Sequence, residues 1–222
     1  FCFLTALAAP VLGCTVRSTI APASLRTTAE ATDYVSTGAY AEALQLCRDF
    51  PAAFAGKATC QPFGSSAEGR PLVALTVSAD GVLTPEAARR EHRPVILIEA
   101  GIHAGEIEGK DACLALVRDL AVLRQHDELL DSCTVLILPI FSVDAHERRS
   151  RYNRINQSGP EEMGWRHTPI GLNLNRDYMK AESPEMRAML SEVYTKWWPE
   201  LLIDDHTTDG ADYQHDVTYA YP

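Results

Sequence analysis

The sequence lacks any apolar run of about eighteen residues, the length that a transmembrane helix needs, so we expect no membrane-spanning segment. Positive charge is scarce: 20 Lys and Arg stand against 30 Asp and Glu, and the formal net charge of −10 argues against nucleic acid as a partner. Glycine and proline number only 13 each, which excludes collagen-like and disordered classes. With 46% hydrophobic residues in 222, one globular domain with a substantial core is expected.

The six cysteines contain no C-x-x-C pair, which argues against a zinc finger or a thioredoxin-type site. Cys47, Cys60, Cys113 and Cys133 could form disulfides in an exported protein. However, Cys113 lies in an apolar helical stretch and Cys133 opens a strand, which favours buried free thiols.

The N-terminal stretch 1–14 is apolar and carries no charge, which is typical of a secretory signal segment. We therefore expect an exported protein that is secreted, periplasmic or lipid-anchored. Two routes of processing remain open: the stretch Val11-Leu-Gly-Cys14 resembles a lipoprotein box with a lipid anchor at Cys14, whereas Ala6-Leu-Ala8 suits an ordinary signal peptidase. Residues 15–222 are then the mature part.

Strand-like and helix-like segments alternate along the mature part. Helices are predicted at 40–50, where Pro51 ends the helix, and from Ser183 as N-cap to about 198. A third helix is predicted at 108–123, where Ala112, Leu116, Leu120 and Leu123, with Cys113 and Val117 beside them, fall on one apolar face. Apolar runs at 72–77, 94–99, 134–140 and 201–205 predict strands, and 62–71 reads as a cluster of turn residues. This alternation predicts an α/β fold with a mainly parallel, mixed sheet flanked by helices.

Two of the predicted strands are followed directly by residues that bind metals. His103 and Glu106 follow the strand 94–99, and a three-residue separation can point both side chains the same way in a helical turn. His206 directly follows the strand 201–205, and ligand sites of open α/β sheets form outside such carboxyl ends. Two His and one Glu would bind zinc and leave a fourth position for water. The H-x-x-E pair alone is equally explained by a solvated His beside the Glu that starts a helix.

Polar residues between these segments could bind an anion. Asn175 and Arg176 present an amide and a planar guanidinium side by side, which suits a carboxylate held through two bonds. A surface loop explains the pair as well, because neighbouring arginines such as Arg151 and Arg154 need not be functional.

Asp204 or Asp205 could orient a metal ligand, cap a helix or be solvated. The remaining histidines have no partner at ligand spacing and are predicted to lie mostly at the surface: His92, His126, His146, His167 and His215.

Four segments together resemble the zinc metallocarboxypeptidase family, the carboxypeptidase A-like group. They are, in the family's order, Gly64-Ser-Ser-Ala-Glu-Gly-Arg-Pro71, His103-x-x-Glu106, Trp165-Arg166 leading to Asn175-Arg176, and the post-strand His206. The resemblance implies one zinc ion per chain held by His103, Glu106 and His206. It also implies that Arg166 stabilises the oxyanion, that Asn175 and Arg176 grip the terminal carboxylate, and that the substrate is a peptide with a free C-terminus.

The sequence departs from the family pattern at three places. Gly105 stands where many members have an Arg that contacts substrate, and Asn173 stands where an Asp commonly orients the first zinc His. The general-base Glu and the Tyr that precedes it would lie beyond Pro222, so we expect 15–222 to be a partial, C-terminally incomplete catalytic domain.

Two other functions stay open from the sequence. A related zinc amidohydrolase or deacylase, acting on small acylated amino acids or cell-wall peptides, shares the H-x-x-E pair and the distal His but need not bind a terminal carboxylate. A non-catalytic zinc-binding module would keep the fold and the metal without the reaction.

Overall fold

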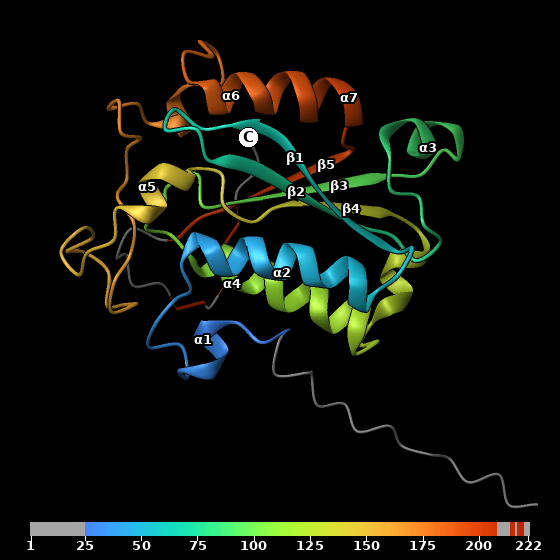
Figure 1. Ribbon diagram of the computed structural model, residues 1–222, viewed down its shortest axis with the longest axis horizontal. Helices are drawn as coiled ribbons and strands as arrows, with labels where there is room; N and C mark the ends of the chain where they lie inside the picture. Colours follow the sequence, from blue (N-terminus) through green and yellow to red (C-terminus); the bar gives the residue numbers. More distant parts are fainter. Residues whose placement is uncertain (1–24, 208–213, 216, 220–222) are drawn as a thin grey trace, which may run out of the picture.

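The computed structural model describes residues 25–207, 214–215 and 217–219, and in it five strands form one sheet with helices on both faces (Figure 1). The elements are, in chain order, α1 (Thr28–Ala31), α2 (Tyr40–Ala53), β1 (Ala58–Ser65), β2 (Pro71–Val77), α3 (Pro85–Arg90), β3 (Val95–Ala100), α4 (Glu108–Val117), η2 (Arg118–Val122), η3 (Asp127–Asp131), β4 (Thr134–Leu138), α5 (Val143–Glu147), η4 (Leu174–Arg176), α6 (Pro184–Ala188), η5 (Met189–Tyr194), α7 (Thr195–Trp197) and β5 (Leu201–Asp205). No helix among the described residues has the length and apolar character needed to cross a membrane. The expected signal segment 1–14, with Cys14, lies outside the described residues.

The strands follow the order β1-β2-β4-β3-β5, and the sheet is mixed as predicted. β3 pairs in parallel with both β4 and β5, whereas β1 with β2 and β2 with β4 are antiparallel. The turn predicted over 62–71 is wrong in its first half, because β1 continues to Ser65. Pro62 fits into this strand because β1 is an edge strand, and the register shifts between Pro62 and Gly64.

Period-two alternation in the central strand β4 divides the core between the two faces of the sheet. Val135 and Ile137 pack into one apolar cluster with α2 and α4, and Leu136 and Leu138 pack into a second cluster beneath the helix that α6, η5 and α7 form together. Figure 1 shows these helices on opposite sides of the sheet. Ser183 caps this last helix as predicted, since its hydroxyl accepts from the Met186 amide.

The predicted helix end at Pro51 is wrong, because α2 continues through this proline to Ala53. Pro51 stands in the last turn, where its missing N–H removes only one bond, and the Phe54 amide still bonds the Phe50 carbonyl at 2.8 Å. The full burial of Phe50 holds this turn against the core.

The expectation of free thiols is wrong for Cys47 and Cys60, which form a disulfide between α2 and β1. Their pairing depends on β1, which the sequence did not predict. Cys113 and Cys133 are free, as expected, but only Cys113 is buried.

The helix predicted at 108–123 is present as α4 followed by the π-helical turn η2. Its predicted apolar face is confirmed in part: Cys113, Val117 and Leu120 are buried, whereas Ala112 and Leu116 are exposed. Leu114 and Ala121 join the buried residues, so the buried apolar side chains recur at ordinary helical spacing.

Candidate metal centre

Two neighbouring parallel strands bring the predicted metal ligands to one edge of the sheet. β3 and β5 are paired so that Ala100 lies opposite Asp205, and both strands end there. His103 and His206, which follow these ends, therefore leave the sheet side by side, with ring centroids 5.0 Å apart. The position of the site is thus set by strand register.

The carboxylate of Glu106 lies between the two imidazoles. His103 Nδ1 lies 3.1 Å from Glu106 Oε1, and His206 Nδ1 lies 2.9 Å from Glu106 Oε2. One ligand atom from each of the three side chains falls within 4.8 Å of the others. His103 and Glu106 are buried, whereas the His206 side chain is 28% exposed, so the cluster opens to solvent on the His206 side.

Local structure around Glu106 permits this approach. A turn closes between the Glu106 amide and the His103 carbonyl at 2.9 Å, directly before α4 begins. A Cβ at Gly109, in the first turn of α4, would lie 2.5 Å from the Asp205 Cβ. Only glycine therefore lets the start of α4 pack this closely against the end of β5.

The outer nitrogen of each histidine is held by an oxygen. His103 Nε2 lies 3.1 Å from Asn173 Oδ1, and His206 Nε2 lies 2.9 Å from Asp204 Oδ2. These contacts favour the proton on Nε2 and leave Nδ1 of both rings directed at the centre of the cluster. Asp204 thus orients His206, whereas the Asp205 carboxylate faces the Cys113 thiol.

Charges around the cluster shift two pKa values in opposite directions. Burial would raise the pKa of Glu106, but the adjacent imidazoles and Arg154 outweigh it and hold this pKa well below its ordinary value. Hydrogen bonds to Asp204 and Glu106 raise the pKa of His206 to about 10, because both carboxylates stabilise the imidazolium. Glu106 is therefore a permanent anion at neutral pH.

Two properties of the cluster fit a zinc ion: the types of its ligand atoms, and a buried nitrogen that makes no hydrogen bond. Two imidazole nitrogens and a carboxylate are ligands that Zn²⁺ prefers. His103 Nδ1 is buried and makes no hydrogen bond, although it faces Glu106. A buried ring nitrogen without a hydrogen bond is rare in folded proteins, and a bound metal would satisfy it.

The other predicted site residues border the cluster. Arg166 Nη1 lies 3.4 Å from Glu106 Oε1 with a side chain 30% exposed. Asn175 Nδ2 lies 3.2 Å from His206 Nε2, and the exposed Arg176 bonds the Asn175 carbonyl at 2.7 Å. All six predicted side chains are thus at or next to one edge of the sheet.

The turn η4, which carries Asn175 and Arg176, is tied to the sheet by a buried carboxyl. The Tyr178 hydroxyl donates to Glu99 Oε2 at 2.9 Å, and Glu99 is the last residue but one of β3. Burial, together with the nearby Asp204, raises the pKa of Glu99 to about 8. At neutral pH this carboxyl is mostly protonated, so η4 is held without a buried charge.

Sequence reasoning missed Arg154 and misjudged His146. Arg154 stood among the arginines that need not be functional, but it is buried and its Nη2 donates to Glu106 Oε1 at 2.9 Å. The sequence did contain one signal for such a residue: Gly105 stands where many members of the family have an Arg, so another arginine could take that space. His146 was predicted at the surface and is buried, with Nδ1 3.3 Å from Glu147 Oε1.

A family model described as zinc carboxypeptidase matches residues 43–202. Carboxypeptidase 2 of Trichophyton tonsurans is 26% identical over 161 residues, which cover 70% of this chain and 26% of that protein. Mouse carboxypeptidase D is 29% identical over 162 residues, which cover 62% of this chain and 12% of that protein.

Solved structures share the fold. A metallo-carboxypeptidase from Burkholderia cenocepacia superposes with a TM-score of 0.59 at 23% identity, over 78% of this chain and 42% of that one. Carboxypeptidase A from Helicoverpa armigera gives a TM-score of 0.54 at 16% identity, over 77% of this chain and 46% of that one.

Proposed function

The chain belongs to the zinc carboxypeptidase family, and on this premise we propose that it hydrolyses the C-terminal bond of peptides with one Zn²⁺ held by His103, Glu106 and His206. The observation that carries the proposal is the convergence of three ligand atoms within 4.8 Å at the sheet edge. The chain spans about a quarter of the length of the fungal carboxypeptidases that it matches, at 26%, so the activity of the whole protein is part of this proposal.

The protein's own residues prepare the metal site. Asn173 and Asp204 hold the outer nitrogens of the two histidines, so that both Nδ1 atoms face the position of the ion. Binding of the ion would displace the proton that His206 otherwise carries on Nδ1. Bound there, zinc would lower the pKa of its water and polarise the scissile carbonyl. The general base that the resemblance implies, a Glu beyond Pro222, stays a prediction.

Arg166 is proposed to stabilise the oxyanion that forms during hydrolysis. Its guanidinium lies beside the cluster, 3.4 Å from Glu106 Oε1, and its side chain is 30% exposed. A fixed positive charge near a developing oxyanion lowers the barrier without reorganisation.

Asn175 and Arg176 are proposed to bind the substrate's terminal carboxylate. η4 presents both side chains next to His206, and Arg176 is exposed. A guanidinium and an amide together can hold a carboxylate through several bonds. This placement would set the scissile bond one residue from the substrate's end, over the metal.

We further propose that residues 1–14 are a signal segment, with a lipid anchor at Cys14 as one outcome of processing, and that 15–222 form part of the catalytic domain of an exported protein. The Cys47–Cys60 disulfide supports export, because disulfides persist in oxidising compartments and are rare in the cytosol.

Zinc content of the purified full-length protein tests the metal site. We expect about one zinc per chain, and loss of the metal in His103→Ala and in His206→Ala. His126→Ala is the control, because this side chain is 80% exposed and remote from the cluster. Zinc content that neither ligand change affects would overturn the site.

Paired substrates test the reaction. A peptide with a free C-terminus should be shortened, and the same peptide with an amidated C-terminus should resist, because only the first offers a carboxylate to Asn175 and Arg176. Equal cleavage of both would favour an amidohydrolase or deacylase. Zinc binding without cleavage of either would favour a non-catalytic module.

A further inference from the structure

Arg154 reaches the metal cluster from a distant part of the chain. It lies between α5 and η4, is 5% exposed, and donates from Nη2 to Glu106 Oε1 at 2.9 Å across a separation of 48 residues. Arg151, three residues earlier, instead has a side chain that is 59% exposed and pairs with Glu161. Burial of a charged guanidinium is costly unless it is paired, so the contact with Glu106 is a specific feature of this loop.

The residue before Glu106 makes room for Arg154. A Cβ at Gly105 would lie 2.7 Å from Arg154 Cγ and 3.1 Å from Arg154 Cδ. It would also lie 2.8 Å from the Gly164 carbonyl. The stem of Arg154 therefore occupies the space that any side chain at position 105 would need.

We propose that Arg154 is a positioning residue for the metal ligand Glu106, and that Gly105 is the residue that admits it. This inference rests on the metal site proposed above. Arg154 holds Glu106 Oε1, and the Thr207 amide donates to Glu106 Oε2 at 3.2 Å. Held at both oxygens, the carboxylate cannot rotate away from the two imidazoles.

The bond from Arg154 is the stronger of these two restraints, because both of its partners are charged and it is shorter, at 2.9 Å against 3.2 Å for the Thr207 amide. Without Arg154, Glu106 would have to be reoriented each time that a metal binds. Partners that orient ligating side chains typically contribute about 10- to 100-fold to metal affinity. Arg154 then acts through Glu106 and does not itself touch the reacting atoms.

The test is zinc affinity of the full-length protein, measured by competition with a chelator. Arg154→Gln, which keeps a long polar side chain without the charge, should bind zinc about 10- to 100-fold more weakly. Arg154→Lys should recover part of this loss, because an ammonium can donate one bond to Glu106. Arg151→Gln is the matched control and should bind zinc as the unaltered protein does.

The absorption spectrum of the Co²⁺-loaded protein gives a second readout, because it reports ligand geometry. It should change in Arg154→Gln and stay unchanged in Arg151→Gln. If Arg154→Gln does not fold, Arg154→Lys decides the matter, because it keeps a buried positive charge and should still bind zinc more weakly than the unaltered protein does.

The outcomes separate this inference from the proposed function. A full-length protein that binds no zinc overturns the metal site itself. A protein that binds zinc, with affinity unchanged in a folded Arg154→Gln variant or equally reduced in Arg151→Gln, overturns the role of Arg154 and leaves the metal site standing.

Discussion

Two buried polar clusters lie within a few residues of each other along the chain, and they differ in what faces the buried atom that makes no hydrogen bond: a carboxylate in one cluster and an ammonium in the other. In the metal cluster, His103, Glu106 and His206 converge, and His103 Nδ1 has no hydrogen bond. In the second, which we call the anchor cluster, Lys110 and Asp111 of α4 meet Thr37 and Gly38 of the segment before α2.

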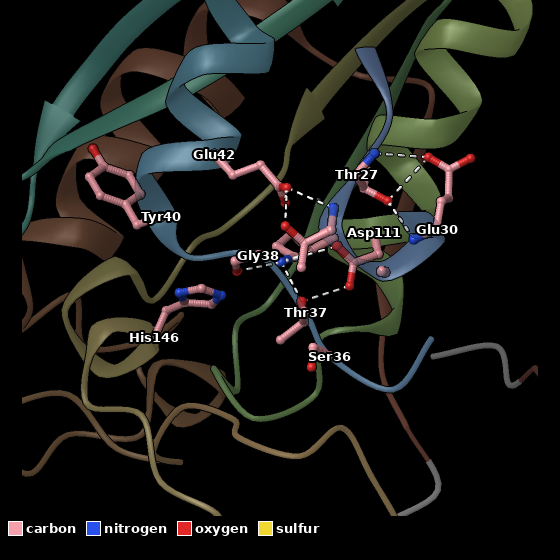
Figure 2. Close-up of polar contacts among 12 residues, drawn as sticks. Thr27, Glu30, Ser36, Thr37, Gly38, Tyr40, Glu42, Asp111 and His146 are labelled. Atoms are coloured by element: carbon pink, nitrogen blue, oxygen red, sulfur yellow. Dashed lines mark hydrogen bonds and ion pairs between the residues drawn. The ribbon is translucent and has the colours of Figure 1, made fainter. Parts of the chain in front are cut away.

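The anchor cluster contains its own cation, because the Lys110 ammonium faces Asp111 Oδ1, an atom that makes no hydrogen bond (Figure 2 shows Thr37, Gly38 and Asp111 of this cluster). Lys110, 1% exposed, donates to the Gly38 carbonyl at 2.8 Å and pairs with Asp111 Oδ1 at 3.0 Å. Lys110 also bonds the Thr37 hydroxyl, which in turn donates to Asp111 Oδ2 at 2.7 Å.

The difference separates a structural role from a binding role. A cluster in which a lysine ammonium faces the carboxylate holds two segments together and needs no further cation. A cluster of convergent bases with an unused lone pair gains from binding a cation. Burial and charge alone do not distinguish the two clusters, since both lie at the start of α4.

The largest expected effect is on the anchor cluster. Lys110→Met leaves Asp111 buried without its cation and should lower the free energy of unfolding by about 3–5 kcal/mol, measured by urea denaturation of the full-length protein. Zinc content of the folded fraction should not change. Lys196→Met, which removes an exposed pair with Glu192, should cost less than about 1 kcal/mol. Loss of zinc with unchanged stability would contradict the division between the clusters.

The next effect concerns residues beside the metal cluster and is expected in the kinetic constants kcat and KM. Arg166→Ala should lower kcat by about 100- to 1000-fold, because a donor to the oxyanion is lost. Arg176→Ala should mainly raise KM, because binding of the terminal carboxylate is lost in ground and transition state alike. Steady-state kinetics separate the two, with the exposed Arg90→Ala as control. A change in KM alone for both variants would refute the division of roles.

The smallest effect is the pH dependence of stability beside the anchor cluster. A hydrogen bond with His146, with help from the Tyr40 amide at 2.9 Å, lowers the pKa of Glu147 from 4.5 to about 2. The folded state therefore keeps this carboxylate charged where the unfolded state takes up a proton. The resulting stability is present above pH 4.5 and is lost as the pH falls toward 2.

Acid titration of stability checks this sign. Glu147→Gln should lose less stability than the unaltered protein between pH 5 and pH 2, by about 1 kcal/mol after allowance for solvent screening. Glu86→Gln, at an exposed position on α3, should follow the unaltered protein. If Glu147→Gln instead lost more stability in acid than the unaltered protein, the predicted direction of the pH dependence would be wrong.

Prediction from sequence succeeded where one short segment carries the whole signal. β2, β3 and β4 were found because buried strands are continuous apolar runs, and the candidate ligands were found because they directly follow apolar runs. β5 was found from the same apolar pattern, although Leu201, Leu202 and Ile203 are exposed. It failed for β1, whose Pro62 and Gly64 resemble turn residues and are accommodated only because the strand lies at the sheet edge. The helix end at Pro51 failed for a similar reason, since core packing of Phe50 outweighed one missing bond.

The sequence by itself determined the class of the fold, the ligand types and their places after strand ends, because these depend on residues near one another in the chain. Tertiary structure decided the rest. The register of β3 with β5 brings His103 and His206 together, the pairing of α2 with β1 allows the Cys47–Cys60 disulfide, and the route of the Arg154 stem over Gly105 reaches Glu106. These contacts join distant segments, and their energies depend on packing that no local pattern encodes.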